Sequence, residues 1–354
     1  MKVYIYNNDF TEQSIRQMYT TVSYLTCDKL YLDNNWKSQF ANLPFVDFIN
    51  FDDFVKMKGD KAIVFFNIID GYYLRKYKSD KSIFFVFRPR GILPEESYYR
   101  NKNLLKMVVL NHIERKVVGL TDYFIFLNTI QKDHYVSKYK KIKYRFDKSY
   151  ILPNIKMIDK SRIIPNNNDL KLKLLYSGGF SKWQNIDLVY RIASDIILNF
   201  PVDTVFTVLT FKENFAKAEQ LAHYYKIKNN TVIKYVPPSI LDEEIVKHDV
   251  GIIIRDNSII NMAASPFKIV DYLSNGLALI VTDNISHQLN EMVKEKYYFT
   301  LTYKNGKLVY SNSELGIFIS QIIENKNKNK EQIINDYYNF ITNIKKIKLE
   351  EVIY

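Results

Sequence analysis

The chain has 354 residues, 47% of them hydrophobic, and a formal net charge of +12. This length suits two domains of ordinary size, and the apolar content excludes an intrinsically disordered chain. The only cysteine, Cys27, excludes an internal disulfide and fits a reducing compartment. No stretch of about 18 apolar residues is present to span a membrane, and the N-terminal MKVYIYNNDF does not have the pattern of a signal peptide. We therefore expect a cytoplasmic protein.

The positive charge is concentrated in the first half of the chain. Residues 1–154 hold 25 Lys and Arg against 16 Asp and Glu, a net of +9, so the remaining 200 residues carry only +3. The segment 138–148 alone has six basic residues and one acid. A basic half attracts polyanions such as an anionic membrane, nucleic acid or a phosphorylated substrate, although a solvated charged face explains it equally well.

Short apolar runs alternate with helical segments along the first half. Strands are expected at 2–6, 30–32, 62–68, 82–87, 123–127 and 149–155, and helices at 11–25 and 98–120. Between residues 156 and 169 the apolar periodicity is lost and Pro165 stands among asparagines, which is typical of a linker.

The second half repeats this alternation. Strands are expected at 172–177, 204–210, 231–236, 250–255 and 277–282, and helices at 187–200, at 213–225, from Pro266 and at 328–346. Ser239 and Asp242 resemble a capping box for a further short helix. Near-continuous apolar strands separated by helices predict an α/β fold, with parallel sheets whose ligands bind at the carboxyl ends of the strands. We predict an N-terminal domain over 1–155, a linker over 156–169, a C-terminal domain over 170–325 and a helical segment over 326–354 that can pack on either domain.

The stretch 251–282 is the most informative for function. A helix of about ten residues is predicted there, with Ser265 as its N-cap, Pro266 in the first helical position and Gly276 at its end. The N-terminus of such a helix suits a phosphate group because its amide groups are unpaired.

Three charged residues surround the start of this predicted helix. Lys268 lies in its first turn, Asp271 follows three residues later on the same face, and Arg255 ends the preceding strand. Two cations would neutralise a pyrophosphate and a carboxylate would hold ribose hydroxyls, which predicts a nucleotide diphosphate site. If the diphosphate is a leaving group, Arg255 and Lys268 are catalytic because they stabilise the charge that develops on it. The alternative is an ordinary capped helix with a Lys–Asp pair at the surface.

The same residues carry a resemblance to a known family. Four segments of this chain resemble the family's donor-site motifs and occur in the same order: Arg255-Asp256, Asn261, Ser265-Pro266-Phe267-Lys268 and Asp271-Tyr272-Leu273-Ser274-Asn275-Gly276. The family is that of the retaining family-4-type glycosyltransferases of bacterial capsule and surface-polysaccharide synthesis. The resemblance implies the GT-B fold, in which two Rossmann-like domains face each other across a cleft. It also implies transfer, with retention, of a sugar from a UDP- or GDP-linked donor to a glycan or lipid-linked acceptor, without a cofactor or a metal.

The resemblance extends to the stretch 174–189, whose loop in the family approaches the diphosphate and the transferred sugar. Gly178 and Gly179 allow a close approach of the backbone, and Lys182 can reach the phosphates. The stretch lacks the GxGxxG spacing of dinucleotide-binding proteins, which argues against a dehydrogenase. The family also has a second acid eight positions before Asp271, where this chain has Ala263.

The N-terminal half resembles the acceptor domain of the same enzymes. Five residues follow a strand expected to end at the interdomain cleft and are the candidates for acceptor contacts: Arg88, Arg90, Gly91, Glu95 and Glu96. Glu114 is interpreted as a helix ion pair rather than a catalyst. No His, Cys or carboxylate cluster has the spacing of metal ligands, and no residue stands out as a general base.

Three other functions remain open. Ala263 motivates a non-catalytic partner subunit that keeps the fold, and a nucleotide-sugar epimerase or phosphorylase of the same fold would need an acid–base set that the sequence does not show. A nucleic-acid binder rests on charge alone, without a binding motif, and we expect no nucleic-acid partner. A lipid-linked acceptor would give the basic N-terminal half a reason to lie on the anionic inner face of the cell membrane.

Overall fold

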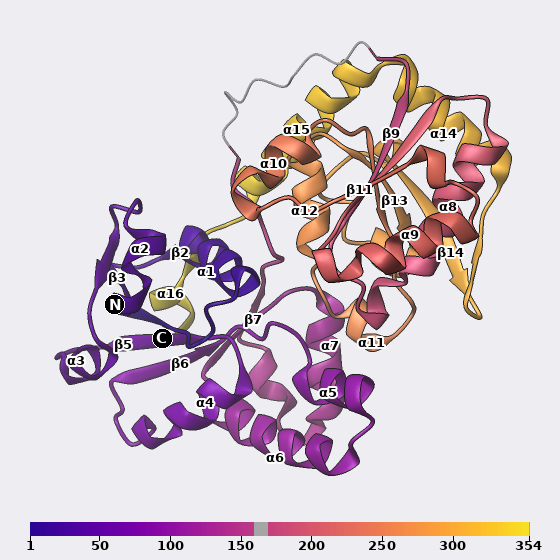
Figure 1. Ribbon diagram of the computed structural model, residues 1–354. Helices are drawn as coiled ribbons and strands as arrows, with labels where there is room; N and C mark the ends of the chain where they lie inside the picture. Colours follow the sequence, from indigo (N-terminus) through magenta and orange to yellow (C-terminus); the bar gives the residue numbers. More distant parts are fainter. Residues whose placement is uncertain (159–168, 354) are drawn as a thin grey trace. The chain divides into compact units, whose positions relative to one another are not determined.

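The computed structural model describes residues 1–158 and 169–353, so most of the linker expected at 156–169 lies outside the described residues. The chain divides into two compact units. Unit 1 runs from Met1 to Ile155 and includes Met262–Ser265 and the chain from Lys345 onward, whereas unit 2 takes Lys156–Asn261 and Pro266–Ile344. Each unit is built around its own seven-stranded sheet (Figure 1).

The sheet of unit 1 has the strand order β4-β3-β1-β5-β6-β7-β8, and all neighbouring strands in it are parallel. Its strands are β1 (Lys2–Tyr6), β3 (Lys29–Leu32), β4 (Val46–Phe48), β5 (Lys61–Phe65), β6 (Ile83–Phe87), β7 (Tyr123–Phe126) and β8 (Ser149–Ile151). The α-helices between them are α1 (Glu12–Tyr24), α2 (Lys37–Phe40), α3 (Phe51–Lys56), α4 (Ile68–Leu74), α5 (Leu93–Asn101), α6 (Leu104–Leu120) and α7 (Thr129–Lys138). The central strands β5 and β7 are buried along their whole length, as their continuous apolar sequences require.

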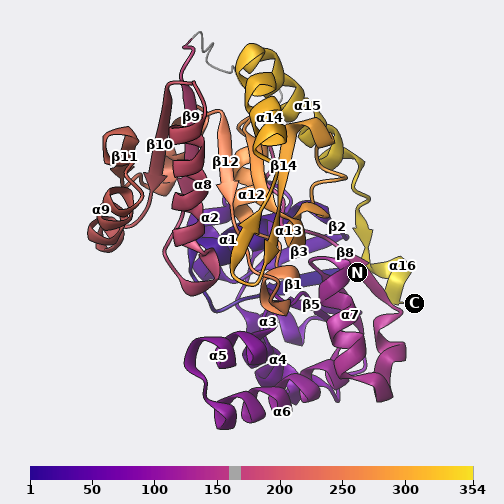
Figure 2. The same cartoon turned by 90° about the vertical axis from the view of Figure 1, so that its right-hand side faces the viewer.

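The sheet of unit 2 has the strand order β11-β10-β9-β12-β13-β14-β15 and is parallel except for the antiparallel pair β14 and β15. Its strands are β9 (Leu172–Ser177), β10 (Thr204–Leu209), β11 (Thr231–Lys234), β12 (Val250–Ile253), β13 (Ala278–Thr282), β14 (Tyr298–Lys304) and β15 (Lys307–Val309). The α-helices are α8 (Ile186–Asn199), α9 (Phe215–Tyr224), α10 (Leu241–Ile245), α11 (Ile259–Met262), α12 (Phe267–Leu273), α13 (Asp283–Ser286), α14 (Asn312–Glu324) and α15 (Lys326–Asn343). The last two lie side by side (Figure 2).

The helix expected at 328–346 is present as α15, but the segment 326–354, expected to be helical, is not one continuous helix. Helix α15 ends at Asn343, and the chain then forms β16 (Ile347–Lys348), which pairs with β2 (Leu25–Thr26), and α16 (Leu349–Ile353). The amino group of Met1 forms ion pairs with Asp28 and with Glu350 of α16. The tail is therefore part of unit 1.

Two other local predictions are wrong. The helix expected over 98–120 is two helices, α5 and α6, because Lys102 between them takes the left-handed conformation, with a φ of 52°. Ser239 and Asp242 form no capping box, since Ile240 is the N-cap residue of α10 and makes no side-chain cap hydrogen bond.

In each sheet, the strand order reverses between two neighbouring strands, β1 and β5 in unit 1 and β9 and β12 in unit 2. Ligands of open α/β sheets bind at such a reversal, outside the carboxyl ends of the strands. The residues that follow these four strands are therefore the ones that a ligand of either unit would meet.

Candidate functional site

In unit 2, β9 and β12 separate toward their carboxyl ends. They pair at only two positions, the last of which joins Gly251 and Leu175. The ring of Tyr272 from α12 packs against Gly251, where a Cβ would stand 2.2 Å from Cδ2 of the ring. The Tyr272 hydroxyl accepts a hydrogen bond of 2.8 Å from the Ser177 amide. Gly251 thus permits the packing that fixes α12 at this edge of the sheet.

Helix α12 brings Lys268 onto the turn that follows β9. A Cβ at Gly178 would stand 2.7 Å from Cε of Lys268, and Gly178 has a φ of +140°, so this close approach requires glycine. The Lys268 ammonium donates to Oε1 of Gln184 at 2.6 Å and lies 4.1 Å from the centre of the Tyr176 ring. Burial, together with the nearby charge of Arg255, lowers the pKa of Lys268 well below its ordinary value.

Arg255 follows β12 by two residues and is 7% exposed. Its amide donates to Oγ1 of Thr282 at 2.9 Å. The guanidinium Nη1 donates to the Trp183 carbonyl at 3.1 Å and to Oδ1 of Asn261 at 3.3 Å. Within the described ranges, Nε of Arg255 has no hydrogen-bond partner. Burial lowers the pKa of Arg255.

In the described part of the chain, the side chains of Lys268 and Arg255 donate to amide and carbonyl oxygens, which carry no formal charge. Two cations near each other at a largely buried site repel, and an anion that supplies the opposite charge stabilises them. A diphosphate suits this pair because its oxygens can accept from a guanidinium and an ammonium at once.

Asp271 lies on the same helix as Lys268 but contacts a different group. Its Oδ1 is 3.5 Å from Nζ of Lys156, and Lys156 also forms an ion pair with Asp242. The charge of Asp271 opposes the lowering of the Lys268 pKa without reversing it. Asp271 therefore stands beside the two cations and is itself engaged by a lysine.

Two polar side chains of the turn after β9 have different surroundings. Lys182 is exposed at the surface, whereas Gln184, two residues later, binds Lys268. The carbonyl of Gly179 accepts a hydrogen bond of 2.6 Å from the Tyr176 hydroxyl, which holds the turn against β9.

The segment before α12, Met262–Ser265, belongs to unit 1. Oγ of Ser265 accepts from the backbone amide of Asn154 at 3.0 Å, and the Ser265 carbonyl accepts from the Asn154 side chain at 2.7 Å. The prediction of Ser265 as N-cap is therefore wrong, and Pro266 is the N-cap of an α12 of seven residues, shorter than expected. Asn128 donates to the carbonyls immediately before and after Ala263, which is 1% exposed.

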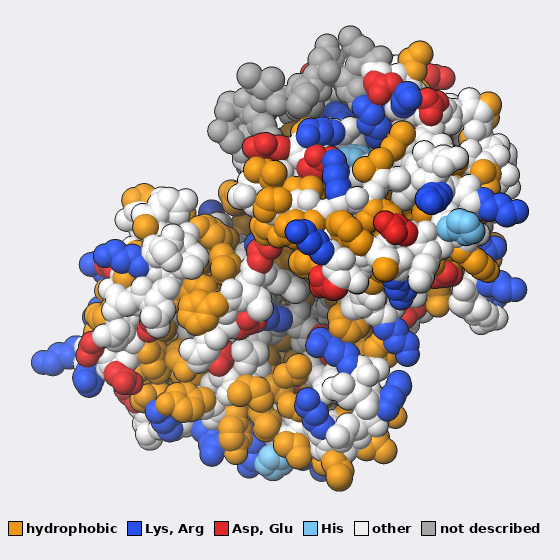
Figure 3. Space-filling view, in the orientation of Figure 1, with side chains coloured by type: hydrophobic (Ala, Val, Ile, Leu, Met, Phe, Trp, Pro, Cys, Tyr) orange, Lys and Arg blue, Asp and Glu red, His pale blue; other side chains and the backbone are white. Residues whose placement is uncertain are grey.

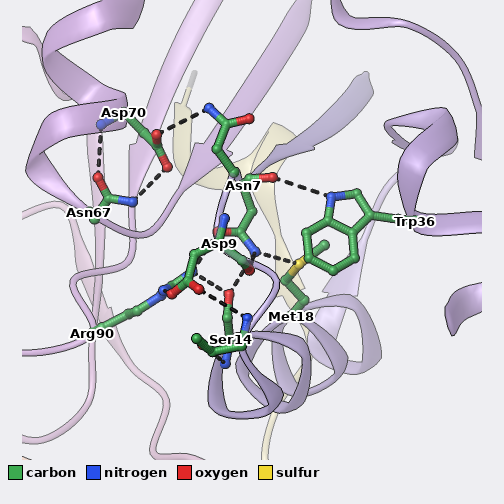
Figure 4. A network of polar contacts seen from close by, with 10 residues as sticks. Asn7, Asp9, Ser14, Met18, Trp36, Asn67, Asp70 and Arg90 are labelled. Atoms are coloured by element: carbon green, nitrogen blue, oxygen red, sulfur yellow. Dashed lines mark hydrogen bonds and ion pairs between the residues drawn. The ribbon is translucent and has the colours of Figure 1, made fainter.

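In unit 1, the loops that follow β1 and β6 meet in a polar network (Figure 4). Arg90 forms an ion pair with Asp9 and donates to Asn7 and to Ser14 of α1. Nδ2 of Asn7 also donates to Oγ of Ser14 at 2.7 Å. The guanidinium is thus positioned by loops that follow two different strands.

Asp70 in the first turn of α4 extends this network to the end of β5. It accepts a hydrogen bond of 2.6 Å from Nδ2 of Asn67, and burial raises its pKa. Burial acts in the same direction on Asp9, but hydrogen bonds from Thr11 and the charge of Arg90 outweigh it and lower the pKa. The two carboxyls at this edge therefore differ in basicity, and Asp70 holds a proton more readily.

Of the five residues expected to contact an acceptor, Arg90 lies in this network and the others have different surroundings. Arg88 is fully buried and donates to the carbonyls of Leu152 and Pro153 at 3.1 and 3.3 Å. Oε1 of Glu96 accepts from the Ile92 amide at 3.1 Å and occupies the space that a Cβ at Gly91 would need.

Glu95 points toward α7, where it lies 2.7 Å from Nζ of Lys138 and 3.2 Å from Nε2 of His134. Glu114 is buried and accepts from the hydroxyl of Tyr139 at 2.6 Å. It also forms an ion pair of 2.5 Å with Lys138, so its interpretation as an ion pair is confirmed.

Sequence reasoning missed the network around Arg90. Its signal is the polar run from Asn7 to Asp9 directly after β1, repeated by Asn67 and Asp70 after β5. Among the described residues, no group of three or more His, Cys, Asp or Glu is placed to hold a metal ion. The helices of residues 1–158 and 169–353 include none that is long and apolar enough to cross a bilayer.

No family model matches the chain, and neither does the sequence of a curated protein. Among solved structures, HepE from Anabaena in complex with UDP matches with a TM-score of 0.65 and 12% identity, over 99% of this chain and 97% of that one. The lipopolysaccharide outer core galactosyltransferase WaaB, in its apo form, matches with a TM-score of 0.62 and 11% identity, over 97% and 98%. Sucrose-phosphate synthase from Thermosynechococcus elongatus has a TM-score of 0.63 and 10% identity, over 99% and 96%. The likeness shows the GT-B fold with two Rossmann-like domains, which confirms the fold class predicted from the sequence.

Proposed function

We propose that the chain is a glycosyltransferase of bacterial surface polysaccharide synthesis. It moves a sugar, with retention, from a nucleotide-diphosphate sugar to a glycan or lipid-linked acceptor. The observation that carries this proposal is the pair of cations, Arg255 and Lys268, with uncharged hydrogen-bond acceptors at the end of β9 and β12. HepE, which shares the fold, has been solved with UDP and with UDP-glucose, and this supports a UDP-linked donor.

In this proposal, the diphosphate lies over the turn at Gly178 and is held by Arg255 and Lys268. As the bond between the sugar and the diphosphate breaks, negative charge grows on the leaving group. The two cations are already in place and therefore stabilise the transition state more than the ground state. Asp271 holds the ribose, and on donor binding its carboxylate exchanges the contact with Lys156 for sugar hydroxyls.

The acceptor is assigned to the network around Arg90 and Asp9. With retention, an oxygen of the leaving diphosphate takes the proton of the incoming hydroxyl on the same face of the sugar, so no separate base is required. Arg90→Gln should lower transfer while leaving nucleotide binding intact.

We propose a cytoplasmic location because the chain has a single cysteine, Cys27, and therefore no internal disulfide.

Thermal unfolding with UDP, GDP, CMP and TDP tests the donor site. A diphosphate at about 100 times its dissociation constant should stabilise the wild type by ~2.7 kcal/mol, because it binds only the folded chain. Lys268→Ala should abolish this effect and Lys217→Ala, an exposed lysine of α9 in the same unit, should keep it. If none of the four nucleotides raises the melting temperature, the proposed glycosyltransferase activity is excluded.

The anomeric configuration of the product, read by NMR before it equilibrates, tests retention. Inversion would contradict the proposed assistance by the leaving group.

A second candidate function is a non-catalytic partner subunit, which is favoured by Ala263 where the family has an acid. Stabilisation by a nucleotide without transfer or hydrolysis of any donor would support that function.

A further inference from the structure

The outward face of α6 is apolar in its first half. Leu104, Leu105, Val108 and Val109 are 63%, 81%, 64% and 58% exposed. Their spacing places them on one face over two successive turns of the helix. These four side chains, here called the α6 ridge, form a cluster of a kind that marks an interaction surface in a folded chain.

The same face is basic in the second half of α6. His112, Arg115 and Lys116 are exposed and continue the face for two further turns. Glu114 is the one acid in the sequence of α6, and it is turned inward to its ion pair with Lys138. The outward face of the helix therefore carries positive charge without a negative residue of its own.

Helix α4 widens the apolar surface. It packs against α6, and its Ile69 and Tyr73 are 51% and 56% exposed. Figure 3 shows hydrophobic side chains gathered over α4 and α6, with Lys and Arg side chains beside them. The unit that bears this surface is also the basic part of the chain, since residues 1–154 have a net charge of +9.

We infer that the α6 ridge docks the chain on an anionic lipid bilayer. Leu104, Leu105, Val108 and Val109 enter the boundary between headgroups and acyl chains, and Arg115 and Lys116 lie on the headgroup phosphates. A helix with one apolar and one basic region lies in the plane of such an interface. A second copy of the chain would cover the ridge but would bring the two basic halves together, and like charges repel. An anionic bilayer can bind both halves of the face, because its acyl chains contact the apolar half and its headgroup phosphates attract the basic half.

Flotation of the full chain with vesicles tests this inference. The wild type should bind vesicles that contain phosphatidylglycerol, should bind more weakly at high salt, and should bind pure phosphatidylcholine far less. Leu105→Asp with Val109→Asp should reduce the partition coefficient by about tenfold for each lost side chain. The matched control is Leu198→Asp with Ile317→Asp in unit 2, whose side chains are 57% and 59% exposed, and it should bind as the wild type does.

The charge is tested by Arg115→Gln with Lys116→Gln. This variant should lose about fivefold per charge on phosphatidylglycerol vesicles and should have a weaker salt dependence. Unchanged binding by the Asp variant, or equal binding to neutral and anionic vesicles, would overturn the inference. So would a wild-type dimer that the Asp variant dissociates while neither binds vesicles. The UDP-induced rise in melting temperature should survive in every variant, so this test and that of the proposed function fail independently.

Discussion

Lys268 crosses Gly178 so closely that a methyl group there would stand 2.7 Å from its Cε and 2.8 Å from its Nζ. The lysine that is proposed to hold the diphosphate is thus positioned by the absence of a side chain 90 residues earlier, where α12 meets the turn after β9.

Gly178→Ala should therefore weaken UDP binding. The added methyl must displace the ammonium, and alanine is strained at a φ of +140°, so we expect about a tenfold loss of affinity, or ~1.4 kcal/mol. Isothermal titration calorimetry measures it. Gly179→Ala is the comparison, because a Cβ there meets nothing closer than 3.8 Å. If both variants lose affinity equally, the contact with Lys268 is not the cause.

The lowered pKa of Lys268 predicts that nucleotide binding takes up protons. Above this lowered pKa the free chain holds a neutral amine, but a diphosphate favours the ammonium and raises the pKa again. UDP affinity should fall as the pH rises through this window. Titration in buffers of different ionisation enthalpy measures the protons that are taken up. Lys268→Arg keeps its charge at every working pH, so uptake should vanish in it, and proton release by the wild type would contradict the assignment.

The framework of unit 2 could be predicted because its signals are local. Strands β12 and β13 are nearly continuous apolar runs, and Pro266 marks the start of α12 in the sequence itself, although the helix ends at Leu273 rather than at Gly276. Strand β14 could not be predicted in the same way. It is only partly buried, and it becomes a strand by pairing with β13 on one side and β15 on the other.

The site shows the same division between local and distant signals. The role of Lys268 can be predicted because the sequence itself places this residue in the first turn of a helix. The failure of Ser265 to act as N-cap cannot be predicted in this way, since it depends on Asn154, 111 residues away in the chain. The pairing of Arg90 with Asp9 spans 81 residues, and only the fold brings together the loops that follow β1 and β6. Single-residue patterns contain no information about such partners.

Gly251→Ala should destabilise unit 2. A Cβ at Gly251 would stand 2.2 to 2.7 Å from three ring atoms of the fully buried Tyr272, so either the ring or β12 must move. Overpacking of this kind costs ~1–3 kcal/mol. Gly119→Ala in α6 should instead stabilise by ~0.5–1 kcal/mol, because its Cβ meets nothing within 4 Å and alanine is the better helix former. Denaturant unfolding followed by circular dichroism compares them, and equal effects would refute the packing argument.

Gln184→Glu tests whether the site is short of negative charge. The new carboxylate would stand where Oε1 of Gln184 now lies, 2.6 Å from the Lys268 ammonium, and would supply the charge that an anion otherwise brings. We expect the free variant to be more stable by ~1 kcal/mol, since the pKa of Lys268 returns toward its ordinary value. UDP should bind about tenfold more weakly or worse, because the carboxylate repels the diphosphate and already occupies the lysine. Gln184→Ala removes a neutral acceptor only, so it should change UDP affinity much less. Thermal unfolding of the free variants and calorimetric titration with UDP give both quantities. A Gln184→Glu variant that binds UDP as tightly as the wild type would show that Lys268 does not hold the diphosphate.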